Sequence, residues 1–163
     1  MSNDCVKYRK ATEDDIERIV QIAREIWHMG GNKAIEDRHG QIGGKPWQDH
    51  IAASMRSAME TRVEENQAIV AVVDGEIAGW GSWSIDEDRS IGTVGYNGVH
   101  PEYRGQGIGT EIVRRILDHI REAGMKIAAV RTGLNEGHAA ARRVYEKLGF
   151  EPLTKSVYYT QKL

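Results

Sequence analysis

Val99-His100-Pro101-Glu102-Tyr103-Arg104-Gly105-Gln106-Gly107-Ile108-Gly109-Thr110 is the most informative segment of the chain. An apolar run with high β-propensity, residues 91–99, precedes its glycines, and an amphipathic helical pattern, residues 108–123, follows them. The glycines therefore lie where a strand passes into a helix. The first N–H groups of a helix have no partner within it, and the helix dipole adds positive charge there. Because glycine leaves these amides accessible, the segment predicts a phosphate-binding turn, with Arg104 as an added cation.

The spacing of the glycines excludes two common phosphate-binding motifs. A dinucleotide fingerprint, G-x-G-x-x-G, would need glycine at Thr110 or Ile112, and no Gly-Lys-Ser/Thr of a P-loop follows. The hexapeptide from Arg104 to Gly109 instead resembles the pyrophosphate loop of the GNAT superfamily of acyl-CoA N-acyltransferases. From these six residues alone, a tight strand-to-helix turn that binds nothing remains an alternative.

A second segment, Val144-Tyr145-Glu146-Lys147-Leu148-Gly149-Phe150, resembles the closing signature of the same family. Together the two motifs cover the C-terminal half of the chain. The resemblance implies an α/β (α+β) fold with a mixed, mostly antiparallel sheet flanked by helices, in the order β-α-α-β-β-β-α-β-α-β-β.

Hydrophobic periodicity predicts elements in this order, with a single strand after the last helix, within one domain spanning residues 1–163. The glycine-rich stretch from Gly30 to Lys45 lacks periodicity and is predicted to be a mobile loop. The predicted strands are 6–10, 67–73, 76–85, 91–99, 126–132 and 156–161, and the predicted helices are 13–28, 46 to about 63, 108–123 and 136–148.

Composition excludes several functional classes. The formal net charge of −2 implies no broad attraction to nucleic acid or to an anionic membrane. The polar N-terminus has no secretory character, and Cys5, the only cysteine, can form neither an internal disulfide nor a cysteine-based zinc site. We therefore expect a cytoplasmic enzyme without a metal. The sequence does not fix the oligomeric state, and a homodimer is one state that it allows.

The resemblance implies which residues bind acetyl-CoA, the acyl donor. The pyrophosphate would lie on the loop, chiefly on its backbone N–H groups, and the pantetheine would pair with Val99 in the preceding strand. A residue seven positions before the signature tyrosine often contacts the cofactor; it is commonly asparagine in the family, but here it is His138. The implied cofactor-binding set is Val99, Arg104, Gly105, Gln106, Gly107, Ile108, Gly109, Thr110, Asn135 and His138. Asn135 also has the features of a helix N-cap, and His138 those of a surface residue.

Acyl transfer to an amine needs an oxyanion donor and an acid for the departing thiolate. In the family the oxyanion donor lies on a strand that splays from its neighbour. The resemblance therefore assigns this role to the backbone N–H of Val99. Asn97-Gly98 is compatible with a bulge there, although Gly98 could instead ease a tight sheet position. The acid would be Tyr145, whose phenol stays protonated at neutral pH; spacing alone allows a core aromatic at the same position.

The sequence does not identify the general base. Carboxylates occur in some family members on the strand before the loop, but residues 93–98 contain none. A water chain held by Tyr96, Asn97 or backbone carbonyls is one alternative. The others are a carboxylate (Glu76, Asp86 or Glu87) and a histidine of the first loop region (His28, His39 or His50).

The acceptor is expected to bind beneath the glycine-rich loop, which Trp27 and Trp47 bracket. Glu36, Asp37 and His39 lie within this loop, and acidic groups would suit a cationic amine, but a solvated loop explains them equally well. Trp80 and Trp83 could add an apolar wall, although strand alternation places them on opposite faces.

These observations predict an N-acetyltransferase that moves an acetyl group directly from acetyl-CoA to a primary amine of a small molecule. Two alternatives remain: an acetyltransferase of protein N-termini or lysines, and a non-catalytic acyl-CoA-binding sensor. The sensor stays an alternative because the strand before the loop contains no carboxylate that could act as the general base.

Overall fold

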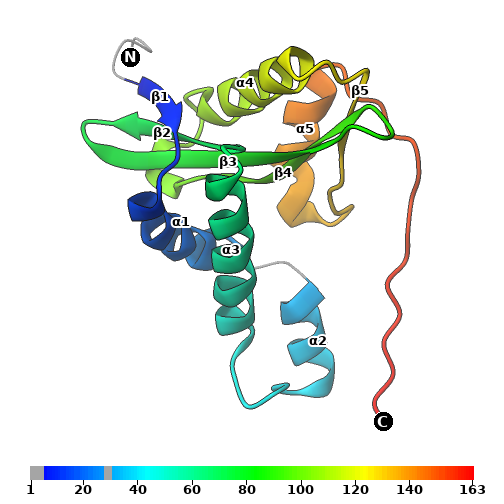
Figure 1. Ribbon diagram of the computed structural model, residues 1–163. Helices are drawn as coiled ribbons and strands as arrows, with labels where there is room; N and C mark the ends of the chain where they lie inside the picture. Colours follow the sequence, from blue (N-terminus) through cyan, green and yellow to red (C-terminus); the bar gives the residue numbers. More distant parts are fainter. Residues whose placement is uncertain (1–5, 28–30) are drawn as a thin grey trace.

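The chain forms a five-stranded sheet covered by helices on both faces (Figure 1). The structure is a computed structural model and describes residues 6–27 and 31–163. The strand order is β1-β2-β3-β4-β5, and every neighbouring pair is antiparallel except β4 and β5. The predicted mixed, mostly antiparallel sheet is therefore confirmed. The strands are β1 (Val6–Lys10), β2 (Ala68–Val73), β3 (Glu76–Asp86), β4 (Ile91–Val99) and β5 (Ile127–Val130).

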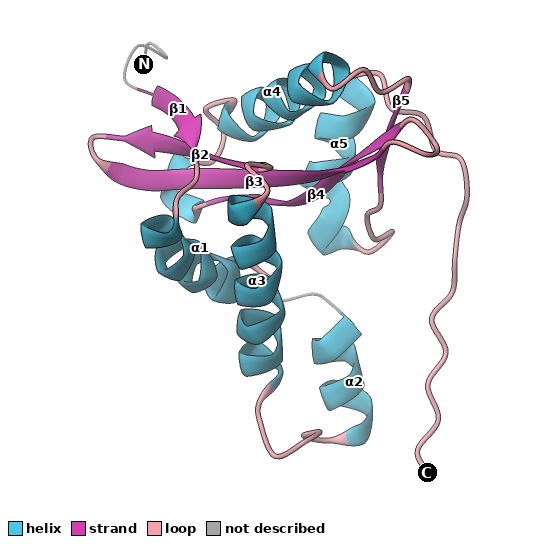
Figure 2. Ribbon diagram, in the orientation of Figure 1, coloured by secondary structure: helices cyan, strands magenta, loops and turns pink. Residues whose placement is uncertain are grey.

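Two helical layers enclose the sheet (Figure 2). The first contains α1 (Glu13–Ile26) and α3 (Trp47–Glu64), and the second contains α4 (Ile108–Glu122) and α5 (Ala139–Lys147). Each layer has its own core cluster, and the two tryptophans of β3 divide between them. Trp80 packs in the α1/α3 cluster and Trp83 in the α4 cluster, as the alternation predicts.

Helix α1 begins as the sequence predicts. Thr12 is its N-cap, and its N–H donates to the Asp15 carboxylate over 2.8 Å, so a capping box closes the first turn. Arg9 of β1 donates two further hydrogen bonds to the same carboxylate, at 2.7 and 2.8 Å. The Asp15 pKa is lowered because hydrogen bonds from Arg9 and Thr12 outweigh the effect of its burial. This contact ties the start of α1 to the sheet.

Helix α4 lies unusually close to the sheet because glycines face it. A Cβ at Gly81 would lie 2.5 Å from Ile112 Cγ2, and one at Gly92 would lie 2.4 Å from Ile120 Cγ2. The isoleucines of α4 thus occupy the space that side chains of β3 and β4 would fill. This close packing fixes the N-terminus of α4, which carries the predicted phosphate-binding turn.

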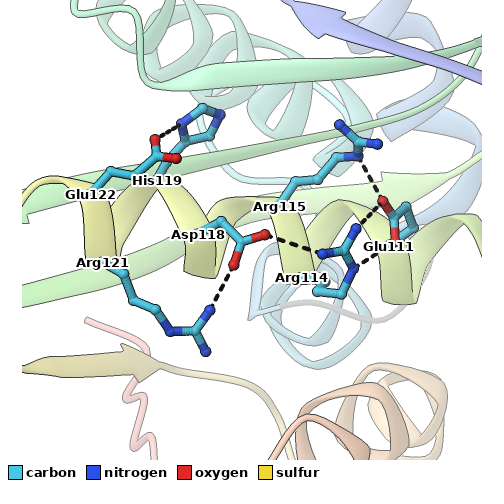
Figure 3. A network of polar contacts seen from close by, with 7 residues as sticks. All are labelled: Glu111, Arg114, Arg115, Asp118, His119, Arg121 and Glu122. Atoms are coloured by element: carbon cyan, nitrogen blue, oxygen red, sulfur yellow. Dashed lines mark hydrogen bonds and ion pairs between the residues drawn. The ribbon is translucent and has the colours of Figure 1, made fainter.

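The outer face of α4 carries a network of ion pairs (Figure 3). Glu111 accepts hydrogen bonds from Arg114 and Arg115, and Arg114 continues to Asp118. The hydrogen bond from Arg114 is the largest cause of the lowered Glu111 pKa. Such pairs at i,i+3 and i,i+4 support the helix, each by about 0.2–0.5 kcal/mol.

The structure differs from the predicted elements in two places. The stretch predicted to be a mobile loop contains helix α2 (Gly31–His39), which packs on α3 and is joined to it where the Trp47 N–H donates to Glu36 Oε2 over 2.8 Å. This helix has no buried residue, so hydrophobic periodicity could not reveal it.

The second difference concerns the C-terminus. The strand predicted at residues 156–161 is not formed, and residues 151–163 run as an extended segment outside the sheet (Figure 1). The β-propensity of this segment is real, but a strand also needs a neighbouring strand with which to pair.

The remaining predicted elements agree with the structure within a few residues. The last predicted helix is divided into a 3-10 turn, Glu136–His138, and α5.

Candidate active site

The candidate site lies where β4 and β5 separate. Their parallel pairing covers Ile91–Val94 of β4, and in the described part of the chain it extends no further. In β4, Gly92 and Val94 are buried and Ile91 and Thr93 are half-buried, whereas Gly95 and Tyr96 are exposed. Beyond Val94 the outer edge of β4 is therefore open.

A bulge accompanies this separation. Opposite β3, Gly95 and Tyr96 of β4 face the single residue Ser82, whose hydroxyl donates to the Tyr96 carbonyl over 3.1 Å. The irregularity lies at these two residues rather than at Asn97-Gly98, where the sequence suggested it. A Cβ at Gly98 would lie 2.5 Å from a ring carbon of Trp80, so Gly98 relieves a tight contact with β3.

The backbone of Val99 points into the open edge. The N–H of His100 donates to the Ala78 carbonyl of β3 over 2.9 Å. Because neighbouring residues of a strand direct their backbone groups to opposite edges, the N–H and C=O of Val99 point away from β3. Arg104 Nε reaches the Val99 carbonyl at 3.4 Å from that side.

The glycine turn forms the N-terminus of α4. Gly105 and Gly107 have φ values of +77° and +81°, a conformation that L-residues adopt at a cost. Gly107 is the N-cap of α4, and no side chain caps the helix. Added Cβ atoms at Gly105 and Gly107 would meet nothing within 4 Å, so these backbone amides border open space. This geometry suits an anion.

Tyr145 of α5 reaches the same region from the other side of the separation. Its side chain is buried in the α4/α5 cluster, and its Oη accepts a hydrogen bond from Asn97 Nδ2 over 3.1 Å. Burial raises the Tyr145 pKa, and the hydrogen bond from Asn97 opposes this effect. The phenol therefore remains protonated at neutral pH. Because its oxygen accepts from Asn97, its own proton is available for another acceptor.

Asn97 is a site residue that the sequence suggested only as a holder of water. Its Nδ2 also donates to the Gly95 carbonyl over 3.0 Å, so the side chain bridges the bulge and Tyr145. The strand period offered a signal, since Asn97 and Val99, two residues apart, share the face directed toward α4 and α5.

Asn135 and His138 contact each other. His138 Nδ1 is hydrogen-bonded to Asn135 Oδ1, and its ring packs against Gly133. Asn135 occupies the N-cap position of the 3-10 turn, as its sequence features indicated. Burial, and secondarily the charge of Arg142, lowers the His138 pKa and so favours the neutral imidazole. Their contact with a cofactor stays a prediction.

The α1 side of the open edge carries aromatic and acidic groups. Trp27, which follows α1, lies with its ring centroid 5.2 Å from that of Tyr96 and 6.3 Å from that of Trp80. Beside them, His100 Nε2 lies 3.5 Å from the carboxylate of Glu25. Neither Glu25 nor the ring of His100 was a candidate from the sequence, because only the tertiary structure brings the end of α1 to the end of β4.

The candidate bases are distributed over the molecule. Glu76 begins β3 at the β2–β3 turn, and Asp86 pairs with Arg89 at the far end of β4 from Val99. Glu87 lies next to Asp86, in the turn between β3 and β4. His39 is hydrogen-bonded to Thr160, and His50 to the Ile42 carbonyl. His28 lies outside the described residues.

The region of α2 holds a separate hollow of about 180 Å³, lined by Asn32, Ile35, Glu36, Ile42, Trp47 and His50. Among the described residues there is no cluster of histidine, cysteine and carboxylate side chains that could hold a metal ion. In the same residues, no helix has the length and apolarity needed to cross a membrane.

Comparison with known proteins agrees with this geometry. A family model described as "Acetyltransferase (GNAT) family" matches residues 17–150. The chain belongs to the GNAT acetyltransferase family. A mycothiol acetyltransferase from Corynebacterium glutamicum is 30% identical over 139 residues, covering 85% of this chain and 44% of that protein. The one from Thermobispora bispora is 40% identical over 72 residues, 44% of this chain and 24% of that protein. The acetyltransferase described here thus spans less than half the length of these curated relatives.

Solved structures share the fold. A PaiA N-acetyltransferase from Thermoplasma acidophilum, in complex with coenzyme A, superposes with a TM-score of 0.73 at 16% identity, covering 96% of this chain and 94% of that one. AAC(6')-Iy in complex with the bisubstrate analogue CoA-S-monomethyl-acetylneamine gives a TM-score of 0.65 at 17% identity, covering 97% and 99%. At these identities the likeness establishes the fold of the GNAT acetyltransferase chain and not its acceptor.

Proposed function

We propose that this chain transfers an acetyl group from acetyl-CoA directly to a primary amine of a small molecule. The observation that carries the proposal is the open edge of β4 beyond Val94. It borders the glycine turn of α4, the outward-pointing backbone of Val99 and, through Asn97, the phenol of Tyr145. Solved relatives that contain coenzyme A or a CoA-based bisubstrate analogue support the choice of donor.

In this proposal the diphosphate of acetyl-CoA binds at the N-terminus of α4. The amides of Gly107, Ile108, Gly109 and Thr110 donate to its oxygens, and Arg104 and Gln106 border the site. The pantetheine extends along the free edge of β4, where the Val99 backbone can pair with it as a neighbouring strand would. The thioester carbonyl then lies within reach of the Val99 N–H.

The acyl transfer proceeds in one displacement. The neutral amine attacks the thioester carbon, and the N–H of Val99 stabilises the oxyanion. The attacking nitrogen becomes positively charged and releases one proton to water as the amide forms. When the C–S bond breaks, the thiolate takes the proton of Tyr145 Oη, and the proton released by the nitrogen returns through water to the phenolate. The ammonium proton of the acceptor leaves before attack, through water near Tyr96 or through the carboxylate of Glu25.

The acceptor would enter from the α1 side. Trp27 and Tyr96 offer aromatic faces to a cation, and the side chain of Glu25 is 53% exposed. An acidic and aromatic approach favours a cationic amine. The relatives named mycothiol acetyltransferase, and the acetylneamine analogue bound to AAC(6')-Iy, support a small-molecule acceptor.

The test is a mass-spectrometric screen of the purified chain with acetyl-CoA and pooled small amines, together with a parallel pool of peptides. We expect release of free CoA, and a mass increase of one acetyl group on members of the amine pool only. Acetylation confined to peptides would contradict the small-molecule acceptor. Tight binding of acetyl-CoA without CoA release in either pool would favour the sensor.

A further inference from the structure

The imidazole of His100 lies beside the candidate site, and the proposed reaction does not yet use it. His100 directly follows Val99, and its side chain is only 13% exposed. The ring caps the 3-10 turn Pro101–Tyr103, because the Glu102 N–H donates to its Nδ1 over 3.4 Å. Its other nitrogen, Nε2, lies 3.5 Å from Glu25 Oε2. The ring thus connects the end of β4 with the end of α1.

The hydrogen bond from Glu102 determines the tautomer of this ring. A backbone N–H can only donate, so Nδ1 must present its lone pair, and the neutral imidazole then carries its proton on Nε2. This proton faces the carboxylate of Glu25. A nitrogen that carries a proton has no lone pair to offer, so on the Glu25 side His100 can orient a base but cannot be the base.

Two carboxylates and one phenol surround the ring. The Glu102 carboxylate lies 3.9 Å from Nδ1, but its side chain is 80% exposed and belongs to the turn that the ring caps. The ring of Tyr103, in the same turn, has its centroid 5.8 Å from that of His100. Glu25 differs from both because it comes from α1, the helix that ends beside the aromatic approach to the site.

Strand alternation places this pair on the acceptor side of β4. Successive side chains of a strand point to opposite faces, and Tyr96 lies on the α1 face, where it packs on Trp27. His100, four residues further on, lies on the same face. Its own backbone neighbour, Val99, points its N–H into the open edge. The carboxylate held by His100 and the proposed oxyanion donor therefore border the same end of β4.

We propose that Glu25 is the base that deprotonates the acceptor, and that His100 is its positioning residue. This proposal rests on the proposed acetyl transfer and deepens it. The Glu25 carboxylate takes one N–H proton from the ammonium group, and the freed lone pair attacks the thioester. Because this side chain is 53% exposed, the proton then passes to water and the carboxylate is restored. The Nε2–H of His100 directs the carboxylate throughout, and the ring neither gains nor loses a proton.

Two substitutions separate the two contacts of His100, because an amide can replace either ring nitrogen. His100→Asn places an amide about where Nδ1 lies, so it keeps a cap for the turn and loses the donor that faces Glu25. His100→Gln reaches one bond further and restores an N–H near the position of Nε2. Glu102→Gln is the control, since it neutralises the other carboxylate beside the ring.

The rate of CoA release with an amine acceptor measures the effect of each variant. Glu25→Gln should lower kcat by about 100-fold or more, the contribution of a general base. His100→Asn should lower kcat by about tenfold, the value of a hydrogen bond to a charged group, and His100→Gln should recover at least about threefold of that loss. Glu102→Gln should stay within about twofold of the unmodified protein. Adding His100→Asn to Glu25→Gln should cause no further loss, because His100 acts through Glu25.

Two kinetic outcomes would overturn the proposal. An unchanged kcat in Glu25→Gln would remove the base. Equal losses in His100→Asn and His100→Gln would mean that the imidazole itself carries the proton.

The imidazole ¹⁵N spectrum tests the tautomer without turnover, above the pH range in which an ordinary histidine titrates. The signal of His100 is assigned by its loss in His100→Gln. We expect a neutral ring protonated on Nε2, and a ring protonated on Nδ1 would overturn the positioning role. If the unmodified protein released no CoA with any amine, the proposed function would be contradicted instead, and the spectrum would still decide the role of the ring.

Discussion

Replacing Gly107 by alanine separates the binding role of the glycine turn from its structural role. Gly107 has a φ of +81°, and a Cβ added there meets nothing within 4 Å. The cost to folding is therefore the left-handed backbone of an L-residue alone, about 1–2 kcal/mol. For a chain of this length, each kcal/mol lowers Tm by roughly 2–4 °C.

Gly124 supplies the matched control at the other end of α4. Its φ is +77°, and its Cβ position is equally open. Gly124→Ala should lower Tm by the same few degrees, because the same backbone strain applies. The two variants differ in what they border, since only Gly107 lies at the N-terminal amides of α4.

The loss in affinity for acetyl-CoA follows from the lost contact. A Cβ at Gly107 occupies the open space over the amides, where the diphosphate is proposed to lie. A hydrogen bond to a charged group contributes about 1.5–3 kcal/mol, so Gly107→Ala should raise the Kd for acetyl-CoA by roughly 10–150-fold. Gly124→Ala should leave this Kd within about twofold of the original value, a change of less than 0.5 kcal/mol.

Isothermal titration calorimetry measures these affinities, with S-acetylpantetheine as a donor that lacks the diphosphate. We expect Gly107→Ala to weaken the binding of acetyl-CoA and to leave that of S-acetylpantetheine nearly unchanged. The reasoning is refuted if the two glycine variants bind acetyl-CoA with equal affinity, or if both donors weaken together.

Four further outcomes are expected. Tyr145→Phe should lower kcat by about 100-fold or more while changing the Kd for acetyl-CoA little, measured by CoA release and calorimetry; an unchanged kcat would make Tyr145 a core aromatic. Because burial raises the Tyr145 pKa, the wild-type protein should lose unfolding free energy as pH rises above about 10, whereas Tyr145→Phe should lose less; equal denaturant profiles would contradict this. Asn97→Ala should lower kcat by about fivefold, the value of one hydrogen bond, and have no further effect when combined with Tyr145→Phe; additive losses would argue against their coupling. Glu25→Gln should raise the KM for the amine and spare the Kd for acetyl-CoA, measured by steady-state CoA release and calorimetry; an unchanged KM would argue against Glu25 facing the acceptor.

The sequence predicted most elements because their burial follows local periods. Helix α4 is an example, since Ile112, Ile116 and Ile120 recur at helical spacing and all three are buried. Prediction from the sequence failed for α2, which buries no residue. It also failed for the C-terminal segment, which has the β-propensity of a strand but no neighbouring strand with which to pair. Local pattern reports what a segment can bury and not whether a partner lies beside it.

For the candidate site, sequence and tertiary structure contributed different parts. The glycines of the turn and the tyrosine signature were sufficient by themselves to indicate the GNAT family, because backbone conformation and phosphate access depend on a few adjacent residues. The separation of β4 from β5, the hydrogen bond from Asn97 to Tyr145 and the approach of Glu25 to His100 join residues far apart in the chain. These contacts depend on how α1 and α5 pack across the sheet, and only the tertiary structure decides that packing.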